Sequence, residues 1–149
     1  MTVERNQFWP LLARLLIGTI FVLSGINKIV AFDQVAGYMA AHGVPAARAA
    51  LVVVTIVELV GGLSLVLGIA TSAGALLLFL YLIPVTLVMH GFWDYRGIQR
   101  QMQLIEFLKN LAIMGGLIYA ALYGAGALSI DGWLARHGRH IPFRRVPAL

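Results

Sequence analysis

Four long apolar runs dominate this sequence of 149 residues. A helix that crosses the hydrocarbon core of a bilayer, ~30 Å thick, needs about 20 consecutive apolar residues, because each residue adds about 1.5 Å. All four runs reach this length and are separated by turn signals; they cover residues 9–31, 49–69, 73–93 and 104–128. We therefore expect an all-α membrane protein that folds as a bundle of four transmembrane helices.

The composition favours a membrane location over a soluble one. Hydrophobic residues make up 60% of the chain and charged residues 11%, and the mean hydropathy is +0.88. Soluble domains carry about a quarter charged residues, because they must cover their surface with groups that bind water. The sequence therefore excludes a soluble monomer, and the same apolar content excludes a disordered chain.

The sequence contains no cysteine. The chain therefore forms no disulfide bond, offers no thiolate nucleophile and supplies no thiolate ligand to an iron–sulfur cluster. A haem held by two histidines is not expected either, because His90 is the only histidine inside a predicted span. We also expect no metal ion and no covalently bound cofactor, since a transition-metal site would need several His or Cys residues at close spacing.

Short connections join the expected spans into one domain over residues 1–130. The turn at residues 70–72 makes the second and third spans an antiparallel hairpin. Residues 33–45 begin with Asp and end with Gly and Pro, which predicts a short capped helix lying in the membrane interface. Residues 131–149 form a basic tail, in which we expect no further helix because of three interruptions, at Gly138, Pro142 and Pro147.

Lysines and arginines at the ends of the spans predict the orientation of the bundle, because such residues accumulate on the cytoplasmic side. The side of the two termini carries five of them, at Arg5, Arg136, Arg139, Arg144 and Arg145, and the other side carries three, at Arg48, Arg96 and Arg100. We therefore expect both termini in the cytoplasm, with the protein in a bacterial inner membrane and the tail on anionic lipids. The net charge of +5 belongs to these flanks, and nucleic acid is not expected as a partner.

Small residues recur where the helices should pack together. Helices associate in membranes through close backbone contact at small residues. The candidates for structural packing lie in the first, second and fourth spans: Gly18, Gly25, Gly61, Gly62, Gly116 and Ala120. We interpret the glycines as structural rather than as part of a cofactor-binding loop, since none follows a strand.

Five charged residues fall inside the spans, namely Arg14, Lys28, Glu58, Glu106 and Lys109. Charged groups are costly in hydrocarbon, so each one is a candidate for a functional site. Side chains lean toward the N-terminus of their helix, so Lys28 and Glu58, on oppositely directed helices, should point toward each other. By the same rule Arg14 should lean toward the cytoplasm, and Glu106 and Lys109 toward the outer surface, where long side chains reach water.

These directions predict a polar pocket near the outer face of the membrane. Its expected ligand-binding residues are Lys28, Glu58, His90, Trp93, Lys109 and Asn110. Glu58, His90 and Lys28 are the catalytic candidates: Lys and His donate hydrogen bonds to the carbonyl oxygens of a quinone head group, while a carboxylate or His exchanges protons. The alternative is that Lys28 and Glu58 form a structural ion pair that fixes the helix register, with His90 as a hydrogen-bonding neighbour.

The motifs around these residues resemble the DoxX family of small bacterial membrane proteins. The resemblance runs from about Arg14 to Tyr123 and rests on four motifs in order: Arg14-Leu-Leu-Ile-Gly18 with Phe21, Gly25 and Lys28; Glu58-Leu-Val-Gly-Gly-Leu with Leu67-Gly68 and Thr71; His90-Gly-Phe-Trp93; and Phe107-Leu-Lys-Asn110 with Gly115-Gly116. The resemblance implies a four-helix membrane bundle. Some relatives are subunits of a thiosulfate:quinone oxidoreductase, and others are linked to oxidoreductase complexes that handle thiol or oxidative stress.

Three functions remain as hypotheses. The first is an integral membrane subunit of a quinone-linked or thiol/oxidative-stress-related oxidoreductase system, which has no redox centre of its own and serves a soluble or membrane partner subunit. The second is a non-catalytic membrane scaffold or assembly factor, in which the intramembrane charges are structural. The third is a small-solute or proton transporter, suggested by Pro84 inside the third span and by Glu58 near the middle of the membrane. A homo-oligomer is compatible with each of them.

Overall fold

The computed structural model describes residues 2–138, with side chains from residue 7 onward. Within this range the chain is helical and contains no strand. Its elements are α1 (Thr2–Val30), α2 (Phe32–Ala41), α3 (Ala47–Leu67), α4 (Thr71–Met89), the 3₁₀ turn η1 (Phe92–Asp94), α5 (Gly97–Tyr123) and α6 (Ile130–Arg136). The helices α1, α3, α4 and α5 are long and apolar enough to cross a membrane. The predicted all-α bundle of four spans is therefore confirmed.

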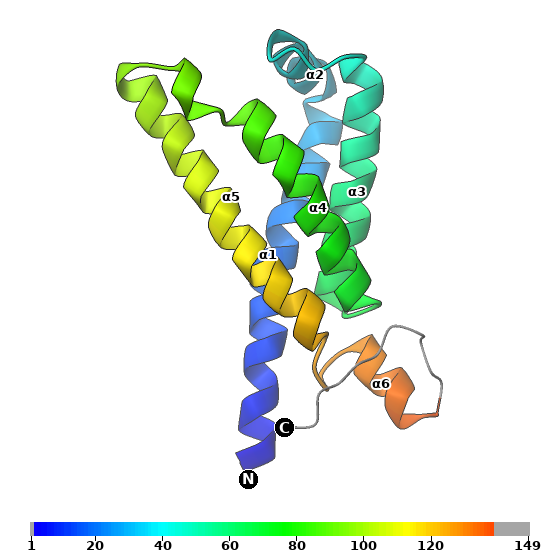
Figure 1. The fold of residues 1–149 in the computed structure, drawn as a ribbon. Coiled ribbons are helices and arrows are strands. Elements are labelled where there is room, and N and C mark those ends of the chain that lie inside the picture. The colour runs from blue at the N-terminus through cyan, green and yellow to red at the C-terminus, as the bar shows by residue number, and fades with distance from the viewer. Residues whose placement is uncertain (1, 139–149) are drawn as a thin grey trace.

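The four long helices pack mainly on their neighbours in the sequence. α1 lies along α3, α3 pairs with α4 as the expected antiparallel hairpin, and α4 lies along α5 (Figure 1). α5 touches α1 where Gly116 meets Ile17. From there the two ribbons diverge toward the end of the molecule that carries α2 (Figure 1).

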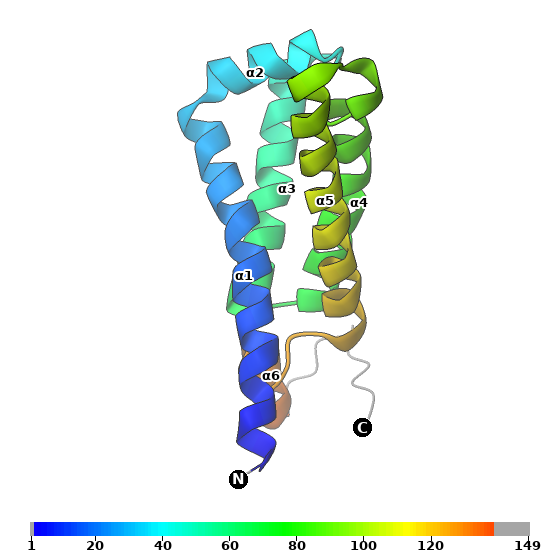
Figure 2. The same cartoon turned by 90° about the vertical axis from the view of Figure 1, so that its left-hand side faces the viewer.

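The short helix expected between the first two spans is present as α2. It runs across one end of the bundle, as Figure 2 shows. Its buried residues Ala36 and Met39 pack on Leu51 of α3. An exposed ion pair between Asp33 and Arg48, 2.8 Å long, also joins α2 to α3. α2 therefore covers the end of the bundle opposite α6.

The fourth span begins earlier than the sequence pattern predicts. α5 starts at Gly97 rather than at residue 104, so most of the expected polar loop after the third span is helical. The residues from 99 to 103 are Gln, Arg and Met, which have good helix propensity although they are not apolar. The helix ends at Tyr123, because Gly124 follows with a positive φ of 74°.

A further helix, α6, forms where the sequence pattern predicted none. The hydroxyl oxygen of Ser129 accepts a hydrogen bond of 2.9 Å from the backbone N–H of Gly132, which caps the start of the helix. Gly138, at φ 71°, lies just beyond its end. Gly138 therefore limits the helix to two turns rather than preventing it. Pro142 and Pro147 lie outside the described residues.

The small residues singled out in the sequence lie at contacts between helices. Gly18 and Gly62 bring α1 and α3 together: a Cβ built on Gly62 would stand 3.0 Å from the carbonyl oxygen of Gly18. Gly25 faces Leu59. The remaining three contacts follow the same pattern, with Gly61 against Leu78, Gly116 against Ile17, and Ala120 in the hydrophobic core.

Replacing Gly62 by Ala is expected to destabilise the bundle by about 1–3 kcal/mol, because the added methyl group meets backbone atoms that cannot move without separating α1 from α3. Gly115→Ala is the matched control. Gly115 is exposed on α5, a Cβ there meets nothing within 4 Å, and Ala favours a helix by about 1 kcal/mol over Gly. The melting temperatures of the two purified variants should move in opposite directions, and equal shifts would contradict the assignment.

Candidate functional site

Lys28 and Glu58 form an ion pair inside the bundle, as the side-chain directions predict. The Nζ atom of Lys28 lies 2.8 Å from Oε2 and 3.0 Å from Oε1 of Glu58. Lys28 also donates a hydrogen bond of 2.7 Å to the hydroxyl oxygen of Ser24, one turn earlier on α1. The Glu58 side chain is 5% exposed and that of Lys28 is 18% exposed. The carboxylate is thus buried, while the ammonium group keeps partial access to the surroundings.

Tyr81 of α4 completes this group. Its hydroxyl donates a hydrogen bond of 2.6 Å to Oε1 of Glu58. Tyr81 was not among the residues predicted for the site, although the hairpin of α3 and α4 indicates that it faces Glu58. Residues at equal distances from the middle of a tight turn face each other in antiparallel helices, and 58 and 81 are equidistant from the turn at residues 69–70. We call Ser24, Lys28, Glu58 and Tyr81 the intramembrane cluster.

The intramembrane cluster satisfies its own hydrogen bonds. The Glu58 carboxylate accepts two bonds from Lys28 and one from Tyr81. An unpaired buried carboxylate would be costly, whereas an ammonium–carboxylate pair carries no net charge and each partner stabilises the charge of the other. The cluster also joins α1, α3 and α4 through side chains. It combines two hydrogen-bond donors with a carboxylate that accepts protons.

His90 and Trp93 lie at the α2 end of α4. His90 directly follows α4, and its Nδ1 lies 2.9 Å from the side-chain oxygen of Gln103 on α5, which makes Nδ1 the donor. Trp93, in η1, has its ring 6.0 Å from that of Phe107 and is 53% exposed. Among the described residues, no hydrogen bond or ion pair joins His90 or Trp93 to the intramembrane cluster.

Lys109 and Asn110 lie on α5. The Nζ of Lys109 is 2.7 Å from Oε2 of Glu106, and the two side chains are 55% and 43% exposed. Asn110 is half-buried. Of the six residues expected to line one pocket, the structure brings Lys28 and Glu58 into direct contact and distributes the other four along the α4–α5 side.

Arg14 corrects an expectation. The direction of its helix predicted that the side chain points toward cytoplasmic water, but Arg14 is 3% exposed. Its guanidinium donates a hydrogen bond of 2.7 Å to the carbonyl oxygen of Leu65 and one of 2.6 Å to that of Leu128. The last four carbonyl groups of a helix lack partners within that helix, and Leu65 is near the end of α3. These carbonyls supply the polar environment that Arg14 was expected to seek in water.

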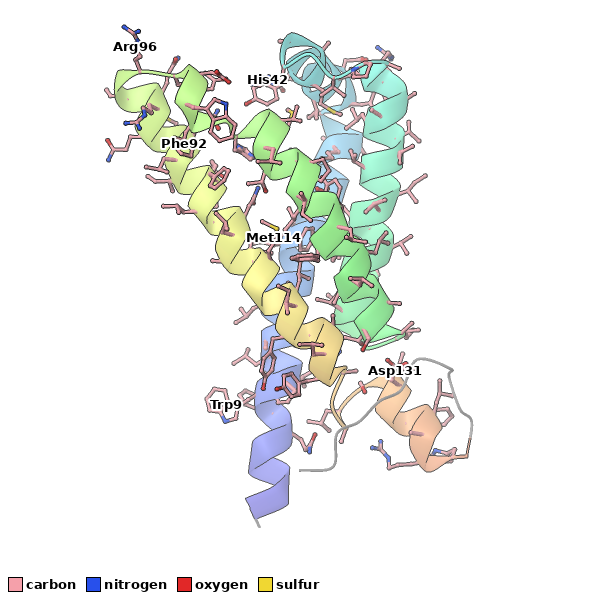
Figure 3. All side chains as sticks on the ribbon, in the orientation of Figure 1. Trp9, His42, Phe92, Arg96, Met114 and Asp131 are labelled. Atoms are coloured by element: carbon pink, nitrogen blue, oxygen red, sulfur yellow. The ribbon has the colours of Figure 1, made fainter. Side chains whose placement is uncertain are left out.

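Near Arg14, which donates to backbone carbonyl groups, Asp131 accepts hydrogen bonds from backbone N–H groups. Its carboxylate accepts hydrogen bonds of 2.9 Å from the backbone N–H of Ala70 and 3.2 Å from that of Thr71, at the start of α4. The N-cap residue of α4, Ala70, has no side chain able to do this. Figure 3 shows Asp131 near the turn between α3 and α4, far from His42 and Arg96. We call Arg14 and Asp131 the polar clasp.

The described residues contain no group of three or more His, Asp or Glu side chains placed to hold a metal ion.

Fold and site together define a four-span membrane protein with a buried Lys–Glu–Tyr cluster between α1, α3 and α4. The sequence profile of the DoxX family matches residues 9–91, which include the whole cluster. The chain belongs to the DoxX family and is an integral membrane protein.

Comparison with individual proteins also shows similarity to membrane proteins. The chain is 32% identical over 121 residues to the inner membrane protein YphA of Escherichia coli K12, covering 81% of this chain and 86% of YphA. It is 34% identical over 121 residues to the inner membrane protein YqjF of the same organism, covering 81% and 88%. A shorter match of 76 residues, 30% identical, links 51% of the chain to 24% of the ER-derived vesicles protein ERV29 of Saccharomyces cerevisiae. No solved structure matches.

Proposed function

We propose that this chain is a membrane subunit of a quinone-linked oxidoreductase system and that the intramembrane cluster binds the quinone head group. The observation that carries the proposal is a carboxylate, an ammonium group and a phenol in hydrogen-bond contact within the membrane-spanning helices. Ionisable groups at such depth are costly and mark functional sites by default. The Lys28 side chain is 18% exposed, so a ligand can approach its ammonium group and compete for its hydrogen bonds.

The chemistry of the cluster suits a quinone. A quinone dissolves in the bilayer and presents two carbonyl oxygens, which accept hydrogen bonds from donors such as Lys28 and Tyr81. Its reduction to a quinol takes up two electrons and two protons. In this proposal a redox-active partner subunit delivers the electrons, because the chain has no cysteine with which to hold an iron–sulfur cluster. The Glu58 carboxylate passes protons to the quinone oxygens.

The α4–α5 side supplies the second part of the proposed site. His90 and Trp93 lie at the α2 end of α4, and Lys109 and Asn110 lie on α5. We place the approach of the quinone from the bilayer there, with the aromatic group of Trp93 and Phe107 at its α2 end. Aromatic side chains with one polar edge suit the boundary between lipid and water.

A scaffold or assembly role is the second candidate, and one observation favours it. All hydrogen bonds of the Glu58–Lys28 pair are made within the protein, to each other, to Ser24 and to Tyr81. Such a group can hold three helices in register without binding any ligand. The two roles differ in what happens when the cluster is altered without unfolding the bundle.

Quinone binding by the purified protein in lipid nanodiscs separates these roles. A short-chain ubiquinone analogue should bind and quench the tryptophan fluorescence, and Tyr81→Phe, which removes one of the proposed donors, should weaken binding about two- to tenfold, since a hydrogen bond from a neutral group contributes roughly 0.5–1.5 kcal/mol. Asp33→Asn, which breaks the exposed ion pair with Arg48, is the matched control and should bind normally. Wild-type protein that binds no quinone would remove the proposal and favour the scaffold.

We also propose that the α6 end of the bundle faces the cytoplasm. The beginning of α1 and α6 lie at the same end of the molecule (Figure 1). That end carries Arg136 in the last turn of α6. Positive residues favour the cytoplasmic side, so both termini would lie in the cytoplasm of a bacterial inner membrane, the membrane of the two Escherichia coli relatives.

A further inference from the structure

We infer that the intramembrane cluster exchanges water and protons with one face of the membrane only, the face that carries α2, and is sealed from the face that carries α6. The inference concerns the same site as the proposed function but does not depend on which ligand the cluster binds. It rests on a difference between the two halves of the bundle on either side of Glu58.

The half toward α6 is closed by apolar side chains. Leu65 of α3, Leu78 of α4 and Leu117 of α5 are each 0% exposed and belong to one core cluster with Phe21 and Ala75. These residues lie between the intramembrane cluster and the polar clasp. Apolar side chains packed at this density leave no room for water and offer it no hydrogen bonds. We call them the apolar plug.

The half toward α2 contains polar groups. Lys28 is in the last turn of α1, so its partly exposed ammonium group lies near the end of that helix. Thr86 of α4 is 2% exposed, and its hydroxyl has no hydrogen-bond partner. Buried hydroxyl groups almost always have a partner, either in the protein or in water. The Thr86 hydroxyl therefore indicates a place for water within this half of the bundle. The Thr71 hydroxyl is also without a partner, but it lies at the start of α4, on the α6 side of the apolar plug.

Helix register places Thr86 near a second buried hydroxyl. α3 and α4 run antiparallel, with Glu58 facing Tyr81 and Gly61 facing Leu78. Residues further toward α2 therefore have lower numbers on α3 and higher numbers on α4. One turn toward α2, the same register brings Thr55 to the level of residue 84, within one turn of Thr86. Thr55 is 8% exposed, and its hydroxyl donates to the carbonyl oxygen of Leu51. On the α2 side of Glu58 the α3–α4 contact therefore includes two buried hydroxyl groups. On the other side, Gly61 and Leu78 separate Glu58 from the polar residues Ser64 and Thr71 at the α6 end.

The route to water leaves along α4 rather than under α2. An apolar group of Met39, Leu51 and Met89 fills the space beneath α2. His90 follows one turn after Thr86 and is hydrogen-bonded to Gln103 of α5. Water therefore reaches the cluster past Thr86 and His90. A proton taken up by Glu58 comes from the α2 face, and a proton that it releases returns there.

The absence of cysteine from the sequence makes the test direct, because each introduced cysteine is the only thiol. Single cysteines replace Ser24, Thr86 or Leu78, and Gln34→Cys and His137→Cys mark the α2 and α6 faces, where both residues are exposed. Each variant is reconstituted in sealed vesicles and treated from one side with silver ion, which reacts with accessible thiolates. Thermal melting of each variant verifies that it is folded.

Cysteine at position 24 or 86 should react at least about tenfold faster from the face marked by Gln34→Cys than from the face marked by His137→Cys. Cysteine at position 78 should react slowly from both faces. Comparable rates from the two faces, fast reaction at position 78, or no reaction at position 24 would each overturn the inference. The two marker variants also report which face is cytoplasmic.

The failure of this inference can be told apart from that of the proposed function. The labelling pattern requires no quinone, so one-sided reactivity can be observed even if quinone binding fails. Conversely, a quinone that binds the cluster should slow the labelling of cysteine at position 24, whichever face supplies the water. Ser24→Cys serves as the second variant, because it is half-buried and replaces a hydroxyl by a thiol of similar size.

Discussion

Lys28→Met alone should destabilise the protein by about 3–5 kcal/mol, whereas the double variant Lys28→Met/Glu58→Leu should recover most of this loss. The single change leaves the carboxylate of Glu58, 5% exposed, with Tyr81 as its remaining hydrogen-bond donor. The double change replaces both charges by apolar groups of similar size, which hydrocarbon surroundings accept. The measurement is the melting temperature of each purified variant in detergent.

The exposed pair of Asp33 and Arg48 is the control for this experiment. Its side chains are 82% and 71% exposed, so Arg48→Met should change the stability by less than about 1 kcal/mol. A single variant as stable as the wild type would show that the ion pair does not hold the bundle together. The double variant also separates the two candidate functions: as a folded protein it should lose quinone binding, while a scaffold would keep its activity.

Arg14→Met should destabilise the protein by about 2–4 kcal/mol, because it removes the donor to two carbonyl groups. The guanidinium joins the end of α3 at Leu65 to Leu128, in the segment after α5. Methionine retains the apolar part of the side chain but leaves both carbonyl oxygens without this partner. Arg14→Lys should recover only part of the loss, since a single ammonium group lacks the fork geometry that reaches two acceptors.

Arg136→Met is the matched control for Arg14. Arg136 also donates to a backbone carbonyl, that of Ala127 at 3.0 Å, but it is exposed, so water replaces the lost bond. Its variant should melt within a few degrees of the wild type. If Arg14→Met melted at the same temperature as Arg136→Met, burial of the guanidinium would have no energetic consequence, and the polar clasp would lose its assigned role.

The sequence predicted the architecture because membrane insertion is governed by length and apolar content, which are properties of each segment alone. The contact of Lys28 with Glu58 was predictable for a similar reason: the direction of a side chain on a helix follows from the direction of that helix. The start of α5 was harder to place. Residues 97–103 are polar enough for a loop but also compatible with a helix, so hydropathy could not locate the boundary.

The missed features depend on contacts between distant parts of the chain. Arg14 was directed toward water because a lone arginine near a helix end usually reaches the interface. Its actual partners, the carbonyls of Leu65 and Leu128, are backbone groups that no side-chain pattern marks. Tyr81 lies in a helix that is apolar on all sides, where no periodicity singles out one face. His90, which directly follows the end of α4, pairs with Gln103 of α5 and not with the intramembrane cluster.

The polar clasp has a consequence for the order in which this protein matures. Synthesis proceeds from the N-terminus, so the hairpin of α3 and α4 emerges from the ribosome before residue 131. Until then, the backbone N–H groups of Ala70 and Thr71 lack the carboxylate that they bind in the finished protein. Leu128, whose carbonyl oxygen accepts a hydrogen bond from Arg14, is also synthesised after this hairpin. The bonds that join Arg14 to Leu128, and Asp131 to the start of α4, therefore form only after residues 128–131 have been synthesised.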